Sequence, residues 1–504
     1  MTYKSLMKLA QVSALVAAIG SVPTLAGAAT VRGFEGTSQL DNCLLGQCYR
    51  PPDTMGAVGT TQFLETTNGS ITVYNKATGA VQSRVDMPSF WTAAGMPGGA
   101  GGDQRVLFDH YTNRWIMIGF GGVGSTVNIA VSDTANAGGT WKSTQIVGAL
   151  GTTLDYPTLG MDDKGVYIGT QNFGDRVTNG RSSLFSIPKA DLFGGAPTVA
   201  NMTRFNHANT VGGAGAYGNV LQAAVNWDGN PGNTTSVMSA SIIDYNLKFH
   251  QINGVNAAGA TKTAATNIVV SLYDDPAPAR QPDGTRLVDT LDDRISGNVY
   301  QHNGKLYSVH TVTPLGTDYT AVRWTVVDAA TGALIGEGDI GSEGFDYYQG
   351  SIAVNELGQV VIGYNRSGGA DKGLAGRIGF LARSFGLDTM GELYQIGDEV
   401  TLRMSDVDDY RCGAHNVIDA GCRQRWGDYS AVTFDPLDHS KFYAIGEYAA
   451  DWADVVPGIN RAVWHTYIAE IGFVPEPESL ALFGVAFAAL FATSRRRRQA
   501  AVAA

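Results

Sequence analysis

The sequence predicts an all-β protein whose main body is a β-propeller, with seven blades preferred and six as the alternative. Three observations support this fold class. Runs rich in Val, Ile, Tyr, Phe and Thr recur along the chain, and no long stretch of the body has helical periodicity. The 64 glycines fall mostly between these runs, where they mark tight turns. The runs also group into units of similar length, which is the pattern of a repeat architecture.

Sheet-sized units follow one another through residues 51–473, the predicted propeller domain. They cover residues 54–90, 103–147, 155 onward, 218–270, 292–340, 348–396 and 426–473. The unit at 292–340 is the clearest, because it holds four apolar strands with Asn-Gly and Thr-Gly turns in about fifty residues, the size of one blade. The unit at 218–270 is the weakest and leaves six blades open. Two β-sandwiches are the other alternative.

One turn sharpens the fold prediction. Residues 134–141 read TANAGGTW, which resembles a relaxed Asp box, the turn between outer strands of sialidase-type blades. The segment PPDTMGAVG at 51–59 and the chain after it also resemble secreted bacterial propeller proteins with sialidase-like blades. The first resemblance implies that small polar residues bond the turn's backbone and that Trp141 fills the space beside the blade. Neither resemblance implies a particular activity.

The N-terminus has the order of parts of a signal peptide. Lys4 and Lys8 give a basic start, residues 9–19 are mostly apolar, and Ala26 and Ala28 supply the small side chains that signal peptidase needs. We therefore predict a signal peptide over residues 1–28, cleaved after Ala28. Residues 29–50 are then an N-terminal segment before the propeller.

The C-terminus carries a second address signal, over residues 474–499. Pro475, Glu476 and Pro477 precede an apolar stretch at 479–493, and a cluster of four arginines follows, Arg495, Arg496, Arg497 and Arg498. Guanidinium groups resist transfer across a bilayer, so such a transmembrane helix stops with its arginines in the cytoplasm and the body outside. This arrangement resembles the PEP-CTERM sorting signal of Gram-negative bacteria. The resemblance implies that an exosortase cuts at the Pro-Glu-Pro element and that the body reaches the cell surface or the exopolysaccharide matrix.

The net charge of the body limits the classes of partner that it can bind. Without residues 1–28 and the sorting signal, the chain has 29 basic and 44 acidic residues, a net charge of −15. An acidic surface of this kind repels phosphate backbones and anionic lipids, so nucleic acid and membrane-surface binding are excluded.

Four cysteines form two close pairs, Cys43 with Cys48 and Cys412 with Cys422. In an oxidising compartment local pairing predicts two disulfides, each closing one loop. Zinc binding is the alternative, and the absence of CxxC spacing argues against it.

The sequence contains no complete catalytic pattern. The resemblance to sialidases implies a site in which three arginines bind the carboxylate of the substrate. The blade arginines that could converge at the axis for this purpose are Arg105, Arg294, Arg323 and Arg425. Acidic segments at 292–294 and 406–410 could bind Ca²⁺, although neither has the spacing of an EF-hand loop. No His pattern indicates a transition metal, and no Gly-x-Ser-x-Gly elbow is present.

We therefore predict no catalytic residue, no metal site and no required cofactor. The leading hypothesis is an exported binding or structural module whose exposed Tyr and Trp rings contact a glycan or a surface protein. A secreted carbohydrate-active enzyme, either a sialidase-like glycoside hydrolase or a lyase, is the alternative.

Overall fold

The computed structural model describes most of the predicted propeller domain. The described residues are 26–99, 101–121, 125–148, 152–174, 182–207, 217–241, 243–409, 424–451 and 462–475, without the side chains of 26–30 and 474–475. Val31–Gly472 form one compact unit, to which all the sites below belong. The chain ends, Met1–Thr30 and Phe473–Ala504, form the other.

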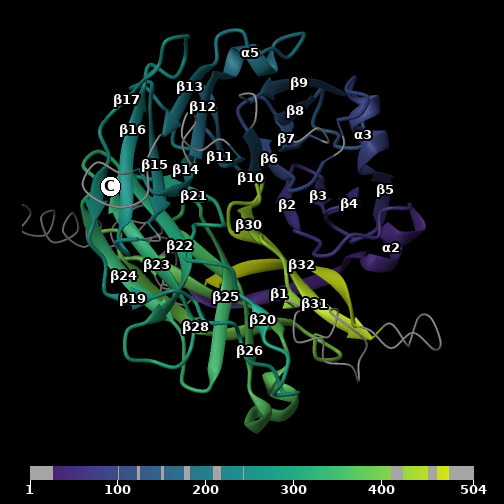
Figure 1. Ribbon diagram of the computed structural model, residues 1–504, viewed down its shortest axis with the longest axis vertical. Coiled ribbons are helices and arrows are strands. Elements are labelled where there is room, and N and C mark those ends of the chain that lie inside the picture. Colours follow the sequence, from purple (N-terminus) through teal and green to yellow (C-terminus); the bar gives the residue numbers. More distant parts are fainter. Residues whose placement is uncertain are drawn as a thin grey trace, which may run out of the picture. The chain divides into compact units, whose positions relative to one another are not determined.

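The protein is all-β, as predicted, and is built mainly from four-stranded antiparallel sheets (Figure 1). The first sheet has the order β2 (Met55–Val58), β3 (Gln62–Thr66), β4 (Ser70–Asn75) and β5 (Val81–Asp86). The second has the order β6 (Arg105–Asp109), β7 (Arg114–Phe120), β8 (Thr126–Ser132) and β9 (Trp141–Val147). A third four-stranded sheet has the order β25 (Phe345–Val354), β26 (Gln359–Gly368), β27 (Gly379–Leu387) and β28 (Leu393–Met404).

The middle of the chain forms a larger sheet made of three antiparallel groups. The first group is β10 (Thr152–Met161), β11 (Gly165–Gly174), β12 (Ser182–Pro188) and β13 (Thr203–His207). The second is β14 (Asn219–Asn226), β15 (Thr234–Ala240) and β16 (Leu247–Asn253), with β17 (Thr261–Lys262) and β18 (Thr266–Ile268) on β16. The third is β21 (Val299–His302), β22 (Lys305–Pro314), β23 (Ala321–Asp328) and β24 (Leu334–Ile340), with β19 (Tyr273–Asp274) on β22.

Parallel pairing between first strands joins these three groups. Met161 of β10 lies opposite Val225 of β14, and Ala224 of β14 lies opposite Val299 of β21. The three groups therefore correspond to the third, fourth and fifth units of the sequence, including the weakly defined unit at 218–270.

The last sheet brings together the two ends of Val31–Gly472. Its order is β1 (Ala26–Ser38), β32 (Ala462–Pro475), β31 (Lys441–Asp451) and β30 (Ala431–Phe434). The sequence does not predict β1, because the run at 26–38 lacks the apolar alternation of the other strands. Its place in the sheet is decided by its partner β32, more than 420 residues later in the chain.

Glu65 anchors this N-terminal strand. The buried Glu65 carboxylate accepts hydrogen bonds from the Thr37 hydroxyl at 2.7 Å and the Tyr74 hydroxyl at 2.6 Å, and also from the hydroxyl of Thr466. Burial raises the pKa of Glu65, and these hydroxyl donors oppose that effect. One side chain of the first sheet thus connects β1 and β32 of the last.

The first strands of successive groups contact one another. β2 contacts β6, β6 contacts β10, and β10 contacts β14. β14 contacts β21, β21 contacts β25, β25 contacts β30, and β30 contacts β2 (Figure 1). The arrangement is propeller-like, because each group of strands meets its neighbours through its first strand.

A recurrent backbone feature marks where these first strands start. Asp53, Asp103, Tyr156, Val220 and Gln349 all have positive φ, between 46° and 57°. Each lies two residues before the first paired residue of its strand, or before pairing resumes after a bulge. Left-handed backbone is unfavourable for side chains other than Gly, Asn and Asp, and most of all for a β-branched residue such as Val220. Of the five, Tyr156, Val220 and Gln349 therefore have the strained backbone.

Short helices connect some of the strands: α2 (Gln39–Leu44), α3 (Met87–Ala93), α5 (Lys189–Phe193) and the 3₁₀ segment η1 (Ala370–Gly376). A capping box between Ser38 and Asp41 starts α2, and Asp86 caps α3 by accepting from the Ser89 amide. Among the described residues, every helix is too short or too polar to cross a membrane. The predicted transmembrane stretch at 479–493 lies outside them.

The TANAGGTW turn joins β8 to β9, between the outer strands as its resemblance implies. Its Asn136 side chain accepts from the Gly138 amide at 3.1 Å, and the buried Trp141 donates its indole N–H to the Ala137 carbonyl at 2.9 Å. Trp141 packs in one core cluster with Trp91 and Trp115. The turn is a structural element of the second sheet.

Candidate functional site

One cavity lies where several first strands start. It has a volume of about 530 Å³. We call it the acidic pocket, and it is lined by Gln47, Tyr49, Arg50, Pro51, Asp53, Asn68, Met87, Pro88, Gly101, Gly102, Asp103, Phe120, Asp155, Arg425 and Asp428. Its residues come from the segments before β2, β6 and β30, from β10, and from the loop after α2. The turn between β3 and β4, the start of α3 and the end of β7 supply the others. A volume of this size suits a small organic ligand or a sugar unit.

Asp53 and Asn68 form the first part of the pocket's polar network. The Asp53 carboxylate accepts from the Asp428 amide at 2.9 Å and from the Asn68 side-chain amide at 2.5 Å. The Asn68 carbonyl oxygen in turn accepts from the Asp103 amide at 3.0 Å. The side chain of Asn68 therefore ties together the segments that carry Asp53 and Asp103.

Asp103 presents an acceptor to the pocket. The Tyr429 hydroxyl donates a hydrogen bond to Asp103 Oδ2 at 2.8 Å. Asp103 is only 6% exposed, yet among the described residues no group donates to its other oxygen, Oδ1, and that carboxyl lines the pocket. A buried carboxylate oxygen that faces a cavity without a protein donor is available to a ligand.

Burial changes the acidity of these carboxyls. Desolvation, with the charge of Asp428 next, raises the pKa of Asp103 to about 7. Desolvation and the charges of Asp428 and Asp103 raise the pKa of Asp53 well above its usual range. Burial also raises the pKa of Asp428, against the opposing charge of Arg425. Carboxyls of this kind can hold a proton near neutral pH, which a general acid requires.

Two tyrosine rings, tilted by 56° to each other, pack next to the carboxyls. Tyr156 and Tyr429 lie with ring centroids 4.7 Å apart, and Tyr156 donates its hydroxyl to the Asp428 carbonyl at 3.1 Å. The guanidinium of Arg105 lies 3.9 Å from the Tyr429 ring centroid, and that of Arg294 lies 4.2 Å from the Tyr156 centroid. Both arginines thus pack against the same aromatic pair.

Three of the four arginines singled out in the sequence lie close to the same group of residues, and each contacts other groups of the protein. Arg105 donates to the carbonyls of Pro157 and Ser296, each at 2.8 Å. Arg294 makes a two-point contact with Asp292, at 2.5 and 2.6 Å. Arg425 faces Asp428 at 3.3 Å.

The fourth arginine, Arg323, lies on β23 and makes a two-point contact with Asp339, both bonds being 2.7 Å. It does not line the acidic pocket. The pocket therefore lacks three arginines that point together at a ligand carboxylate, and the sialidase-like interpretation stays a prediction.

The two acidic segments considered for calcium are used within the fold. Asp292 pairs with Arg294, and Asp293 accepts from the Tyr273 hydroxyl at 2.8 Å. Asp406 pairs with Arg403 at 3.1 Å. No group of three or more His, Cys, Asp or Glu side chains in the described part of the chain is arranged to hold a metal ion.

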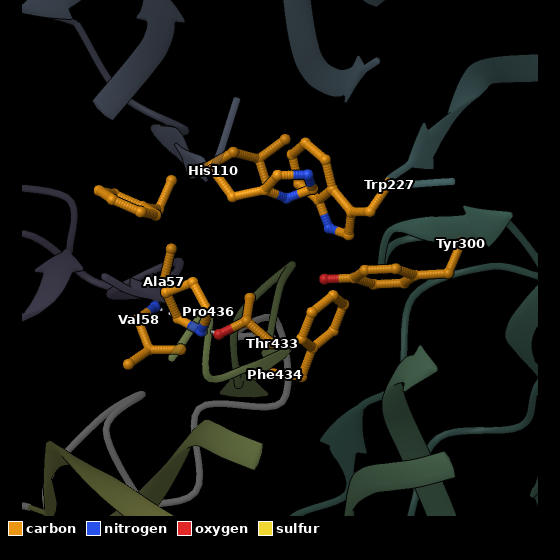
Figure 2. Close-up of a pocket in the computed structure, with 10 residues that line it drawn as sticks. Ala57, Val58, His110, Trp227, Tyr300, Thr433, Phe434 and Pro436 are labelled. Atoms are coloured by element: carbon orange, nitrogen blue, oxygen red, sulfur yellow. Dashed lines mark hydrogen bonds between the residues drawn. The ribbon is translucent and has the colours of Figure 1, made fainter. Parts of the chain in front are cut away.

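The opposite ends of the first strands are apolar. A pocket of only about 20 Å³ lies there, lined by Ala57, Val58, Leu107, Phe108, His110, Trp227, Tyr300, Thr433, Phe434 and Pro436. We call this the apolar end. Figure 2 shows His110 beside Trp227, with the hydroxyl of Tyr300 directed toward the centre. The His110 and Trp227 ring centroids are 4.6 Å apart, and burial lowers the pKa of His110. The volume accommodates about one water molecule.

The other predicted site residues have different outcomes. The Cys43–Cys48 disulfide is confirmed, and its loop carries the pocket residue Gln47. Cys412 and Cys422 lie outside the described residues, as do Glu476, Pro477 and the four arginines at 495–498. Ala26 and Ala28 lie at the start of β1, and Pro475 is the last residue of β32. Signal-peptide cleavage stays a prediction.

Asp53, Asn68, Asp103 and Asp428 were not identified from the sequence as site residues. A weak signal existed, since Asp53 and Asp103 each lie two residues before an apolar strand. An acidic side chain at such a strand start is equally typical of a solvated loop, so the position alone does not distinguish the two.

Comparison with protein families confirms the C-terminal prediction. Residues 473–498 match the family model described as the PEP-CTERM protein-sorting motif. The motif indicates an exported bacterial protein, membrane-anchored or at the cell surface, that an exosortase processes. The match covers the sorting segment and not the body. No curated protein matches the chain.

Solved structures resemble the chain only distantly. A protein of unknown function from Dyadobacter fermentans DSM 18053 is 12% identical with a TM-score of 0.40, covering 88% of this chain and 99% of that one. The WD40 domain of SCAP from fission yeast is 9% identical with a TM-score of 0.34, covering 88% and 98%. An α-L-arabinanase from Cellvibrio cellulosa, complexed with arabinohexaose, is 8% identical with a TM-score of 0.30, covering 68% and 94%.

Proposed function

We propose that the body is a seven-bladed β-propeller that binds a saccharide in the acidic pocket after export. Two observations support seven blades. The contacts between first strands run from β2 through β6, β10, β14, β21, β25 and β30 and return to β2. The positive-φ residues in or just before five of these strands also repeat the same local geometry. The last blade contains strands from both ends of the domain, because β1 pairs with β32.

The proposal of saccharide binding rests on which residues line the acidic pocket. Sugars offer many hydroxyl donors and acceptors and a flat apolar face. The pocket supplies carboxylates at Asp53 and Asp103 and an exposed guanidinium at Arg425. Tyr49, 56% exposed, and the half-buried Phe120 supply rings for the apolar face. The carboxylates and rings converge on one cavity of sugar size.

A glycan array probed with the exported protein tests this function. We expect binding to at least one glycan class, and we expect Tyr49→Ala to weaken it by about tenfold, the loss of one aromatic stacking contact with its associated burial. Tyr394→Ala is the matched control, since Tyr394 is 38% exposed on β28 and does not line the pocket. Equal binding by both variants would exclude the pocket as the glycan site.

Glycoside hydrolysis is the second candidate, and the shifted carboxyls favour it. One carboxyl that holds its proton beside another that ionises is the pair that acid–base cleavage of a glycosidic bond requires. Asp53 and Asp103 are the candidates for these roles. Chromogenic glycosides test the activity, which is expected to disappear in Asp53→Asn and Asp103→Asn. Binding on the array without turnover of any glycoside would leave the binding function alone.

We also propose the processing of both chain ends. Signal peptidase cuts after Ala28, and an exosortase cuts at Pro475–Pro477, which places the acidic body at the surface or in the extracellular matrix of a Gram-negative cell. Intact-mass measurement of the protein from the native host tests both cuts. A mature protein that keeps Arg495–Arg498 would contradict the second.

A further inference from the structure

The acidic pocket is lined by more acidic than basic side chains, which restricts the saccharides that it can accept. Four carboxyls line it, on Asp53, Asp103, Asp155 and Asp428, against the two guanidinium groups of Arg50 and Arg425. Arg425 already faces Asp428 at 3.3 Å. When its carboxyls are ionised, the pocket repels an anionic sugar, and a neutral sugar leaves the excess of carboxylates uncompensated.

Asp103 offers one acceptor oxygen to a ligand in this pocket. Its Oδ2 accepts from Tyr429 at 2.8 Å, whereas Oδ1 faces the pocket without a donor among the described residues. The neighbouring charges are mixed: Asp428 and Asp155 oppose ionisation of Asp103, and the buried Arg105 favours it. A cation that enters the pocket would add to the effect of Arg105 and offset that of the two carboxylates.

We propose that the ligand of the acidic pocket is a saccharide that carries a protonated amino group, with Asp103 Oδ1 as the acceptor of its N–H donors. This inference rests on the proposed saccharide-binding function and names the substrate class. An ammonium group donates three hydrogen bonds and carries one positive charge, so it can bond to Oδ1 and to a second carboxylate of the same pocket.

A bare metal ion fits the pocket less well than an amino sugar. The cavity of about 530 Å³ is far larger than an ion needs, and Tyr49 and Phe120 offer ring surfaces that an ion does not use. The Asp53 oxygens already accept from Asp428 and Asn68. In the described part of the chain, no three carboxyl or imidazole groups are grouped for a metal.

The experiment compares two oligosaccharides that differ only at nitrogen. Isothermal titration calorimetry of the exported protein would use glucosamine oligomers and N-acetylglucosamine oligomers of the same length, at a pH where the amine stays protonated. We expect the amine form to bind about tenfold more tightly or better, as a charge-assisted hydrogen bond provides. Asp103→Asn keeps the size of the side chain and an acceptor for Tyr429, and it should abolish the preference. Asp371→Asn, at an exposed carboxyl on η1, is the matched control and should retain it.

Each result has a defined meaning. Equal affinity for both oligomers in the unaltered protein would overturn the amine inference and leave saccharide binding intact. Binding to neither oligomer, with binding to other glycans on the array, would also overturn it. Absence of binding to any glycan would instead contradict the proposed function itself. Calcium binding that Asp103→Asn removes, without an amine preference, would identify a metal site and overturn the inference. The comparison on the unaltered protein decides the matter even if Asp103→Asn does not fold.

Discussion

The two ends of the first strands differ in chemistry although the same strands supply both. The acidic pocket, at the strand starts, has about 530 Å³ of space, buried carboxyls and positive-φ residues at Asp53 and Asp103. The apolar end has about 20 Å³ and is filled by aromatic and aliphatic side chains. Buried carboxyls with raised pKa values are unfavourable for folding, and such groups are concentrated at functional sites. The comparison supports the proposal that the acidic pocket is the binding site and that the apolar end contributes to stability.

The largest expected effect is a loss of stability at the apolar end. Phe434→Ala should lower the free energy of unfolding by about 3 to 5 kcal/mol, because a nearly buried ring leaves a cavity among Tyr300, His439 and Phe442. Denaturant unfolding measures this loss, and calorimetry should find glycan affinity unchanged. A large change in glycan affinity would contradict the inference that the apolar end takes no part in binding.

Glu65→Ala tests a junction that belongs to neither end. The substitution leaves the buried hydroxyls of Thr37, Tyr74 and Thr466 without their common acceptor, so it should lower the free energy of unfolding by about 2 to 4 kcal/mol. Susceptibility of β1 to proteolysis should rise as well, since Thr37 is released. A stability equal to that of the unaltered protein would show that pairing with β32 alone holds the N-terminal strand.

The acidic pocket should make stability fall as pH rises. The pKa of Asp103 is raised to about 7 in the folded protein, so the folded state binds more protons than the unfolded state between about pH 4 and pH 7. The free energy of unfolding should therefore be highest at the acidic side of this window and decrease toward pH 8. Asp103→Asn should reduce the decrease by about 1 to 3 kcal/mol, measured by denaturant unfolding across the window. The same pH dependence of the free energy of unfolding in both proteins would contradict a raised pKa at Asp103.

The smallest effect on stability is expected at Arg425. Its side chain is 48% exposed and its contact with Asp428 is 3.3 Å, so Arg425→Gln should change the free energy of unfolding by less than about 1 kcal/mol. The substitution removes a positive charge from the acidic pocket and should therefore strengthen binding of an amino sugar. Calorimetry with the glucosamine oligomer measures this, and weaker binding would indicate that Arg425 contacts the ligand directly.

Much of the fold was predictable because strand patterns are local. The unit at 292–340 has the strands and turns that the structure contains, and the TANAGGTW segment forms its turn between β8 and β9. The N-terminal strand β1 was not predictable, because its sequence lacks apolar alternation and its partner β32 lies at the other end of the domain. The acidic pocket was missed for a related reason, since Asp53, Asp103 and Asp428 come from three distant segments.

The sequence by itself determined the all-β class, the local Cys43–Cys48 disulfide and the sorting motif at 473–498, because each depends on residues close together in the chain. Only the tertiary structure decided which arginines are neutralised and which carboxyls are buried together. Arg294 is occupied by Asp292, whereas Asp103 keeps one oxygen toward the cavity. The physical reason is that burial and charge pairing depend on neighbours brought together by folding, and the order of residues along the chain does not contain those distances.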